Sequence, residues 1–407
     1  MNAYNRQSSP VRDSVSESPH NKVLLVTLIA PVGNYGNILQ HYALQEAIKS
    51  LGYDVESLDC PMIELGFAQK MLDAISGFAV KNLKRTVKLV LAALGVKKYR
   101  EKLIAKLKGK QPSYQPTASQ QSRRNTIFQD FYREYIDTMI PSTYREVLTS
   151  SKSRWSKYKY VIAGSDQILN IGIVRTFEAL RYYYLEFAAE EQRVFYAPSF
   201  GVSRLKFHER HVHRKGLQGF KKLSCREEEG CRIIKELTGR EAELVLDPTL
   251  LITADDWRKI ARKPSYPIPE HYALCYFWNN NNEEYMRAVR ELSGGRQVIY
   301  ALDYEHDSYS MTGPREFVWL IDHADYVFTE SFHGTAFSVN FRKKFVAFGT
   351  APCFGRIRTL LANTGLLDRI YYPDKEFIDS EIDYDAVNKR LSFLREDSMK
   401  YLASCLA

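Results

Sequence analysis

The sequence predicts an α/β protein with two domains, each built around a sheet of parallel strands. Short runs rich in β-branched and aromatic residues alternate with stretches of helical spacing, which is the pattern of βαβ units. The chain has 407 residues, more than one hydrophobic core usually organises. Apolar residues make up 45% of the chain and charged residues 26%, so most of it should fold around such cores.

The first half of the chain carries the elements of the first domain. A turn at 33–37 contains two glycines, which permit a tight strand-to-helix connection. It leads into a helix over 38–50, where apolar residues recur at helical spacing. The predicted strands of this half are Lys22–Leu28, Asp54–Leu58, Tyr160–Ala163 and Arg193–Ala197.

The same alternation restarts near residue 217 and predicts a second domain over 217–375. Its predicted strands are Glu243–Leu246, Tyr272–Phe277, Gln297–Leu302, Tyr326–Thr329 and Phe345–Phe348. The first domain then spans 21–216. Residues 1–20 are polar and rich in Ser, so we expect a flexible tail, and residues 376–407 are expected to form a last helix.

Positive charge is concentrated in a helical insertion of the first domain, expected at about 77–125. From 81 to 110 there are eleven Lys or Arg and one acid, Glu101, so this segment carries +10, the rest of the chain about −1, and the whole chain +9. Apolar residues lie between the cations, a composition suited to a helix on an anionic membrane surface, here through 77–110. Packing of the apolar stripe on its own domain is the equal alternative. No nucleic-acid module accompanies the basic segment, so nucleic acid is not an expected partner.

The sequence favours the cytoplasm as the compartment. No apolar run approaches the roughly 18 residues of a membrane-spanning helix, and the first residues lack the apolar stretch of a secretory signal. The six cysteines form no CxxC pair and no dense framework, which suits a reducing environment. Localisation is therefore expected to be cytoplasmic, and binding of the basic segment to lipid would place the chain at the inner face of a membrane.

Four polar segments follow predicted strands, where ligands of open parallel sheets bind. They contain Asn34, Tyr35 and Asn37 in the first; Ser165, Asp166 and Gln167 in the second; Arg226 in the third; and Glu330, Ser331, His333, Gly334 and Thr335 in the fourth. Each has a structural alternative: a necessary turn, a helix cap, a surface ion pair beside three Glu, and a structural histidine. An arginine fork suits phosphate or carboxylate, and an imidazole at a helix start can act as acid or base.

Together these segments resemble the polysaccharide pyruvyl transferases. Seven elements follow in the order of that family and cover roughly residues 22–369, far more than any single motif. They are Asn34–Gln40, Gly164–Gln167, Tyr196–Gly201, Ser224–Glu227, Leu246–Leu251, Ala324–Tyr326 with Glu330–Thr335, and Arg356–Arg369, which resembles the family's Arg-Leu-Leu tail element.

The resemblance implies two Rossmann-like domains facing across a cleft, as in GT-B glycosyltransferases, with a C-terminal helix that can return to the first domain. It implies phosphoenolpyruvate as donor substrate and a glycan acceptor, which can be lipid-linked, giving a cyclic pyruvate ketal and phosphate. No metal and no further cofactor is expected. The trio His208, His211 and His213 lies in a stretch rich in Arg and Lys, which is a poor cation site.

The resemblance also assigns roles to the polar residues. His333 is the expected general acid at C3 of the donor, and the expected base on the sugar is Asp166, with Glu330 second. Arg226 and the helix start at Ser331, Gly334 and Thr335 are expected to bind the donor. The expected acceptor or cleft residues are Asn34, Tyr35, Asn37, Ser165 and Gln167.

One position departs from the family pattern, and it leaves the donor's cation open. Some relatives carry Arg-Leu-His where this chain has Ser331-Phe332-His333, so another cation must substitute for the missing arginine. Arg356 and Arg358 are both candidates. The alternatives to a pyruvyl transferase are a GT-B glycosyltransferase that uses a nucleotide sugar and a non-catalytic carbohydrate-binding relative.

Overall fold

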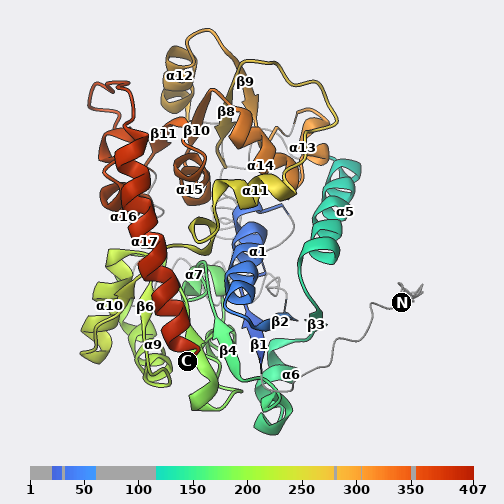
Figure 1. Ribbon diagram of the computed structural model, residues 1–407, viewed down its shortest axis with the longest axis vertical. Coiled ribbons are helices and arrows are strands. Elements are labelled where there is room, and N and C mark those ends of the chain that lie inside the picture. The colour runs from blue at the N-terminus through green and yellow to red at the C-terminus, as the bar shows by residue number, and fades with distance from the viewer. Residues whose placement is uncertain (1–20, 30–32, 61–115, 279–281, 304, 350–353) are drawn as a thin grey trace, which may run out of the picture.

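The protein consists of two α/β lobes, of which the first lies below the second in Figure 1. The computed structural model describes residues 21–29, 33–60, 116–278, 282–303, 305–349 and 354–407. Each lobe is centred on a parallel sheet of five strands. The expected tail at 1–20 and most of the basic insertion lie outside the described residues.

The first sheet has the strand order β3-β2-β1-β4-β5, in which the order reverses beside β1. Its strands are β1 Lys22–Val26, β2 Asp54–Asp59, β3 Met139–Pro141, β4 Tyr160–Ala163 and β5 Arg193–Phe195. The first-lobe helices are α1 Tyr35–Ser50, α5 Ala118–Tyr135, α6 Tyr144–Thr149, α7 Ile171–Val174, α8 Phe177–Tyr183, α9 Phe207–Gln218 and α10 Glu228–Thr238. Strand β1 lies in the middle of the sheet. Four of its five residues are fully buried, as expected for a strand covered on both faces.

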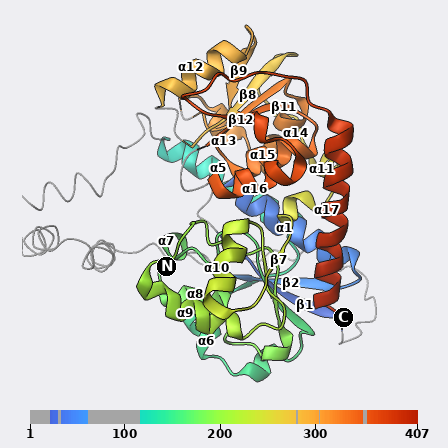
Figure 2. The same ribbon diagram turned by 90° about the vertical axis from the view of Figure 1, so that its left-hand side faces the viewer.

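The second sheet has the order β12-β11-β10-β8-β9. Its strands are β8 Tyr272–Tyr276, β9 Gln297–Tyr300, β10 Tyr326–Thr329, β11 Lys344–Phe348 and β12 Ile370–Tyr371. The helices of this lobe are α11 Ala254–Ile260, α12 Glu283–Leu292, α13 Ser308–Met311, α14 Pro314–His323, α15 Phe332–Asn340 and α16 Phe354–Thr364. Two Rossmann-like domains therefore face each other in a GT-B-like arrangement (Figures 1 and 2).

Ligands of such sheets bind where the strand order reverses. In the first sheet that point lies between β1 and β4, and in the second between β8 and β10. The segments that follow β1, β4 and β10 are three of the four polar segments identified in the sequence. The topology thus directs these segments toward the space between the lobes.

The segment after residue 216 packs in the first lobe rather than in the second. A short parallel pair, β6 Ser224–Cys225 and β7 Glu243–Leu244, lies here with α10. Leu223, Ile233 and Leu237 share one hydrophobic core with Leu24 and Val26 of β1, and Figure 2 shows α9 and α10 in the lower lobe. The boundary expected at residue 216 therefore runs through one core, because the strand–helix pattern continues across it without a change of period.

The last helix, α17 Tyr384–Cys405, runs along both lobes (Figures 1 and 2). It begins beside the second sheet, where the Tyr384 hydroxyl donates to the Lys343 carbonyl oxygen. Further along, the Ser398 hydroxyl oxygen accepts from the Leu246 N–H at 2.9 Å, and the Tyr401 hydroxyl donates to Phe195 O at the end of β5. Helix α17 thus contacts both lobes.

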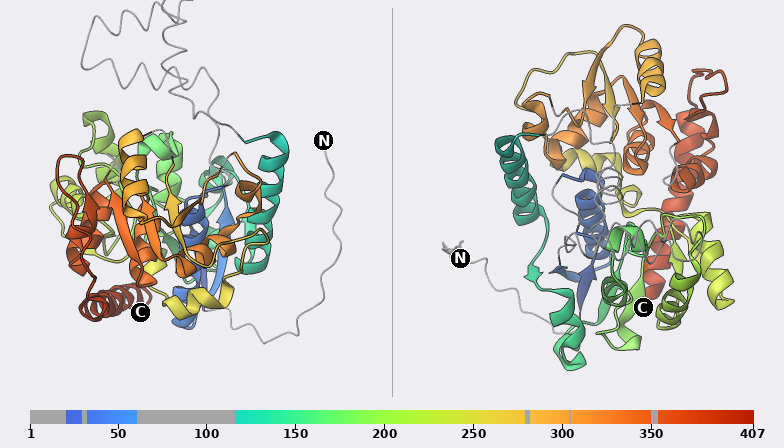
Figure 3. Two further views of the ribbon diagram at one scale, coloured as in Figure 1. Left: turned by 90° about the horizontal axis from the view of Figure 1, so that it is seen from above. Right: turned by 180° about the vertical axis from the view of Figure 1, so that it is seen from behind.

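Helix α1 joins the lobes through a shared core. The ring of Tyr35 stacks on Phe317 of α14 with 4.3 Å between centroids, and the Tyr35 hydroxyl donates to Thr312 O at 3.1 Å. Arg124 of α5 is fully buried beside it and donates to Tyr35 Oη and to Thr312 O, both at 2.9 Å. Figures 1 and 3 show α5 reaching toward the second lobe. The insertion expected to end near 125 therefore ends earlier, since α5 begins at Ala118 behind its Thr117 capping box.

Two histidines are buried in the first lobe, and their burial makes stability depend on pH. Burial lowers the pKa of His41 to about 3 and that of His213 to about 4. Below about pH 6.5 the unfolded chain therefore binds protons that the folded chain does not, so stability falls as the pH falls. Between pH 7 and pH 5 we expect each histidine to lower the free energy of unfolding by about 2 kcal/mol.

Denaturant unfolding at pH 7 and pH 5 measures this loss. His41→Gln should reduce the loss by about 2 kcal/mol, because glutamine does not titrate in this range. His211 is exposed on α9 of the same lobe, and His211→Gln is the matched control that should leave the loss unchanged. An equal loss in wild type and His41→Gln would contradict the prediction.

Candidate active site

Four of the residues that follow strands meet between the lobes. Asp166 comes from the loop after β4, Arg226 from the segment after β6, Asp247 from the loop after β7, and His333 from the start of α15. All four are at least nine-tenths buried. Three of them, Asp166, Arg226 and His333, are predicted from the sequence, and the structure brings these three together with Asp247.

Arg226 is the centre of this cluster. Its Nη1 donates to Asp247 Oδ2 at 2.5 Å and its Nη2 to Asp166 Oδ1 at 2.7 Å. Burial, the largest single effect, would raise the pKa of both carboxyls, but Arg226 together with the other charges and hydrogen bonds around them lowers both, so they stay ionised. The surface ion pair considered from the sequence is therefore excluded, since the side chain of Arg226 is fully buried.

The geometry of Arg226 does not favour a direct grip on the donor. Both terminal nitrogens bond to carboxylates, and Nε lies 3.9 Å from Glu227 Oε2. Asp166 is likewise a poor proton acceptor, because its carboxylate is ion-paired and its pKa lies below the usual range. The roles of donor grip and base expected for Arg226 and Asp166 stay predictions, and the structure favours positioning roles for both.

His333 lies beside Asp247, with 3.8 Å between His333 Nε2 and Asp247 Oδ2. Within the described parts of the chain, Nε2 has no hydrogen-bond partner although it is buried. Burial lowers the pKa of His333, and Arg226 and Arg356 lower it further against the opposing pull of Asp247 and Asp166. The imidazole is therefore neutral near pH 7 and suited to accept a proton.

Gly36 in the first turn of α1 makes room for this imidazole. A Cβ at position 36 would lie 2.0 Å from His333 Nδ1, closer than any real contact. Because Gly36 has no side chain, the backbone of α1 in the first lobe can lie close to His333 of the second lobe. This close approach gives the glycine of the Asn34–Gln40 motif a physical reason.

Asn37 and Ser165 connect α1 and the loop after β4 to the same cluster. Asn37 Nδ2 donates to Asp166 Oδ2 at 3.3 Å, and the Ser165 hydroxyl donates to Asp247 Oδ2 at 3.1 Å. Gln40 supports both residues, since its side chain accepts from Ser165 N and donates to Asn37 O. These predicted cleft residues therefore contact the acidic members of the cluster.

Other residues predicted for the site have structural contacts. Asn34 caps α1 by accepting from Asn37 N at 3.1 Å. Gln167 Oε1 accepts from Asn170 Nδ2 at 2.8 Å, and Tyr35 belongs to the core between the lobes. Their positions agree with the cap and turn alternatives considered from the sequence.

The start of α15 is also held by its own side chains. Ser331 is the N-cap, and its hydroxyl oxygen accepts from Gly334 N at 3.4 Å. The Thr335 hydroxyl donates back to Ser331 O at 3.0 Å. Glu330 Oε1 accepts from the backbone N–H of Trp278 at 2.6 Å, which ties β10 to the end of β8. These contacts orient the turn that presents His333.

Asp247, Glu227 and Arg356 are buried residues of the site that the sequence pattern does not single out. Asp247 follows a short strand, as Asp166 does, and precedes Pro248, but the sequence marks it only as a member of the Leu246–Leu251 motif. Glu227 looked like one of three exposed acids, yet it is 2% exposed. Burial of these side chains depends on packing between the lobes, which residue spacing does not reveal.

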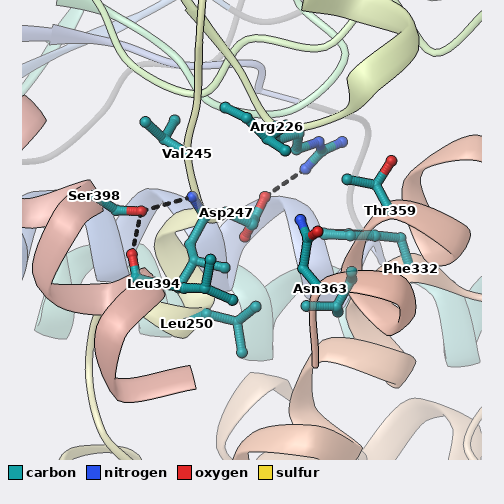
Figure 4. A pocket seen from close by; sticks show the side chains of 12 residues that line it. Arg226, Val245, Asp247, Leu250, Phe332, Thr359, Asn363, Leu394 and Ser398 are labelled. Atoms are coloured by element: carbon teal, nitrogen blue, oxygen red, sulfur yellow. Dashed lines mark hydrogen bonds and ion pairs between the residues drawn. The ribbon is translucent and has the colours of Figure 1, made fainter. Parts of the chain in front are cut away.

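Two cavities adjoin the cluster. The one in Figure 4 lies between Arg226, Asp247 and α17 and measures about 20 Å³, room for about one water molecule. The other measures about 390 Å³ and lies between the loop 201–204, the start of α10 and the start of α16. The larger cavity is the one with room for a small substrate.

The described residues contain no group of three His, Cys, Asp or Glu placed to hold a metal ion. His213 of the trio considered for a metal is buried, and its Nδ1 lies 2.6 Å from the Tyr184 hydroxyl. Among the helices of the described regions, none is long and apolar enough to cross a bilayer.

Comparison with known proteins gives weak structural likenesses. A protein of Listeria monocytogenes described as a UDP-N-acetylglucosamine 2-epimerase is 9% identical, with a TM-score of 0.44 over 94% of this chain and 90% of that one. The UDP-GlcNAc 2-epimerase of Methanocaldococcus jannaschii is 10% identical, with a TM-score of 0.38 over 92% and 99%. MurG of Acinetobacter baumannii is 8% identical, with a TM-score of 0.36 over 94% and 98%.

The strand order of the two sheets is what identifies the GT-B-like fold of this chain. No curated protein matches the chain. A family model does match, over residues 34–352, which is most of the chain and includes all four clustered residues. The chain belongs to the polysaccharide pyruvyl transferase family.

Proposed function

We propose that the protein transfers the pyruvyl unit of phosphoenolpyruvate to a sugar diol of a surface polysaccharide or of its lipid-linked precursor and releases phosphate. The family membership supports a transferase acting in polysaccharide assembly. The observation that carries the chemistry is the buried His333, whose uncharged Nε2 lies beside Asp247 and whose neighbours include two arginines. A proton acceptor next to cations suits a reaction between a hydroxyl group and an anionic donor.

The proposed reaction needs one proton donor and one proton acceptor. C3 of the donor receives a proton as the first sugar hydroxyl adds to C2, and His333 accepts the proton of that hydroxyl. The second hydroxyl then attacks C2, the bond from C2 to the phosphate oxygen breaks, and phosphate leaves with the second hydroxyl proton. The lowered pKa of His333 favours this accepting role over the acid role expected from the resemblance.

Incubation with labelled phosphoenolpyruvate and a panel of acceptor glycans tests the proposal. Phosphate release with an acid-labile ketal on the glycan is the expected result. Release of nucleotide from a nucleotide sugar would support a glycosyltransferase instead. Glycan binding without either product would support a carbohydrate-binding protein and would contradict the proposal.

The basic segment at 77–110 suggests where the reaction takes place, although it lies outside the described residues. We propose that it attaches the enzyme to the anionic cytoplasmic face of a membrane, where lipid-linked acceptors are carried. Each Lys or Arg near such a surface contributes about 1 kcal/mol, so several cations suffice for reversible, salt-sensitive attachment.

Co-sedimentation with liposomes measures this attachment. Wild type should sediment with anionic but not with neutral liposomes at low salt. A variant with six cations changed to Gln should lose this binding; the changes are at Lys84, Arg85, Lys88, Lys97, Lys98 and Arg100. If wild type does not bind anionic liposomes at low salt, the segment is not a membrane anchor.

A further inference from the structure

The larger cavity lies on the interface between the lobes and has charged walls. The first lobe contributes the loop 201–204 with Arg204 and the carboxyl groups of Glu227 and Glu229. The second lobe contributes Arg356 and Arg358 from the first turns of α16. Three guanidinium groups and two carboxyl groups thus line a space of about 390 Å³. Such a lining suits a small molecule that is anionic at one end.

Glu227 is held firmly through one carboxyl oxygen, while the other accepts no hydrogen bond from the described residues. Its Oε1 accepts from the Ser199 hydroxyl at 2.8 Å, from Phe200 N at 3.0 Å and from Gly201 N at 3.4 Å. Its Oε2 is buried and accepts no hydrogen bond from any described residue. The three bonds to Oε1 fix the carboxyl group in the cavity wall, while Oε2 lies 3.9 Å from Arg226 Nε without a hydrogen bond.

Arg356 is the buried cation of the opposite wall. It is 4% exposed, and its Nε has no hydrogen-bond partner in the described regions. Its guanidinium carbon lies 5.9 Å from the centroid of the Phe332 ring, and that of Arg226 lies 4.7 Å from the same ring. The cavity therefore adjoins the residue next to His333. Arg358 and Arg204 are exposed and lie at the rim.

We infer that this cavity binds the enol phosphate donor, with Arg356 holding its anionic groups and the Glu227 carboxyl giving a proton to its C3. The inference rests on the proposed function and names the donor site and the acid that this reaction needs. It also ranks Arg356 above Arg358 as the cation that replaces the arginine absent at Ser331, because Arg356 is the buried one with an unpaired nitrogen.

The proton transfer balances with the steps already proposed. The electron pair of the C2–C3 double bond forms the new C3–H bond with the proton from Glu227 Oε2. The acceptor oxygen bonds to C2, and its proton passes to His333. After phosphate has left, His333 returns a proton to solvent and the Glu227 carboxylate takes one from solvent. The cycle needs no other reactant.

The environments of the two groups support this division of roles. Burial raises the pKa of Glu227 against the pull of Arg226 and Arg356, which favours its protonated form. Burial lowers the pKa of His333, which favours its neutral form. At one pH, a protonated Glu227 can therefore give a proton while a neutral His333 accepts one, as an acid and base pair requires. Glu227 lines the cavity together with Arg356, which places its carboxyl group next to a bound donor.

Glu227→Gln tests the acid. Glutamine keeps the size and the accepting Oε1 but has no proton to transfer, so kcat should fall at least about 100-fold. The dissociation constant for phosphoenolpyruvate, measured by titration calorimetry, should stay within about threefold of wild type. Glu228→Gln is the control, since Glu228 is an exposed neighbour and should change neither value. A folded Glu227→Gln protein with nearly normal kcat would overturn the assignment.

Arg356→Gln tests the donor site. Loss of a buried charged hydrogen-bond donor should weaken phosphoenolpyruvate binding about tenfold or more. Arg287→Gln, an exposed change on α12 of the same lobe, should leave binding unchanged. Unaltered binding in a folded Arg356→Gln protein would overturn the donor site while the function stands. If wild type neither binds nor consumes phosphoenolpyruvate, the proposed function fails as well.

Discussion

Replacing His333 by glutamine should lower kcat at least about 100-fold while the protein stays folded, because the proton acceptor of the proposed reaction is lost. The ring is buried and neutral, and its Nε2 is free to receive a proton beside Asp247. Glutamine is similar in size and polarity, so the packing against α1 should persist. The assay is phosphate release from phosphoenolpyruvate, with circular dichroism and the melting temperature as folding controls.

Gly36→Ala provides an independent test of the same histidine from the opposite lobe. The added methyl group would lie 2.0 Å from His333 Nδ1 and must displace the ring. We expect a loss of kcat close to that of His333→Gln, and the double variant should be no worse than either single variant. Gly172→Ala is the control, because its methyl group would meet only the Asn170 side chain. Nearly normal activity of Gly36→Ala would show that this position of His333 is not the working one.

The sequence predicts the sheets well because their strands are buried and apolar. Strands β4 and β10 begin and end at the predicted residues, and the other predicted strands differ by a few residues at their ends. Strands β3, β6 and β12 were missed, since two or three residues are too few to show a period. The lobe to which β6, β7 and α10 belong depends on tertiary packing, so the boundary at residue 216 could not be corrected from the pattern.

The site is predictable in its members but not in their contacts. Polar residues after strands β4 and β10 identify Asp166 and His333, because parallel topology places strand ends on one side of a sheet. Arg226 beside three glutamates has the appearance of a surface pair, and only the packing of β6 against the first lobe buries it. Asp247 gains its importance from three partners that lie far away in the sequence, Ser165, Arg226 and His333.

Arg226→Lys should lower the free energy of unfolding by about 3 kcal/mol, because it breaks a buried ion cluster without removing the carboxylates. Lysine keeps the charge but loses the planar fork, and a single ammonium group does not reproduce the two bonds to Asp166 and Asp247. One buried carboxylate is then left without its partner. Denaturant unfolding at pH 7 measures the change.

Arg232→Lys is the matched control. Arg232 lies on α10, six residues after Arg226, and forms an exposed ion pair with Glu236. Exposed pairs contribute about 0–1 kcal/mol, so this change should have little effect on stability. The difference between the two variants isolates the effect of burial on the same substitution. If Arg226→Lys is as stable as Arg232→Lys, the cluster does not contribute to stability, and Arg226 would again be a candidate for direct contact with the donor.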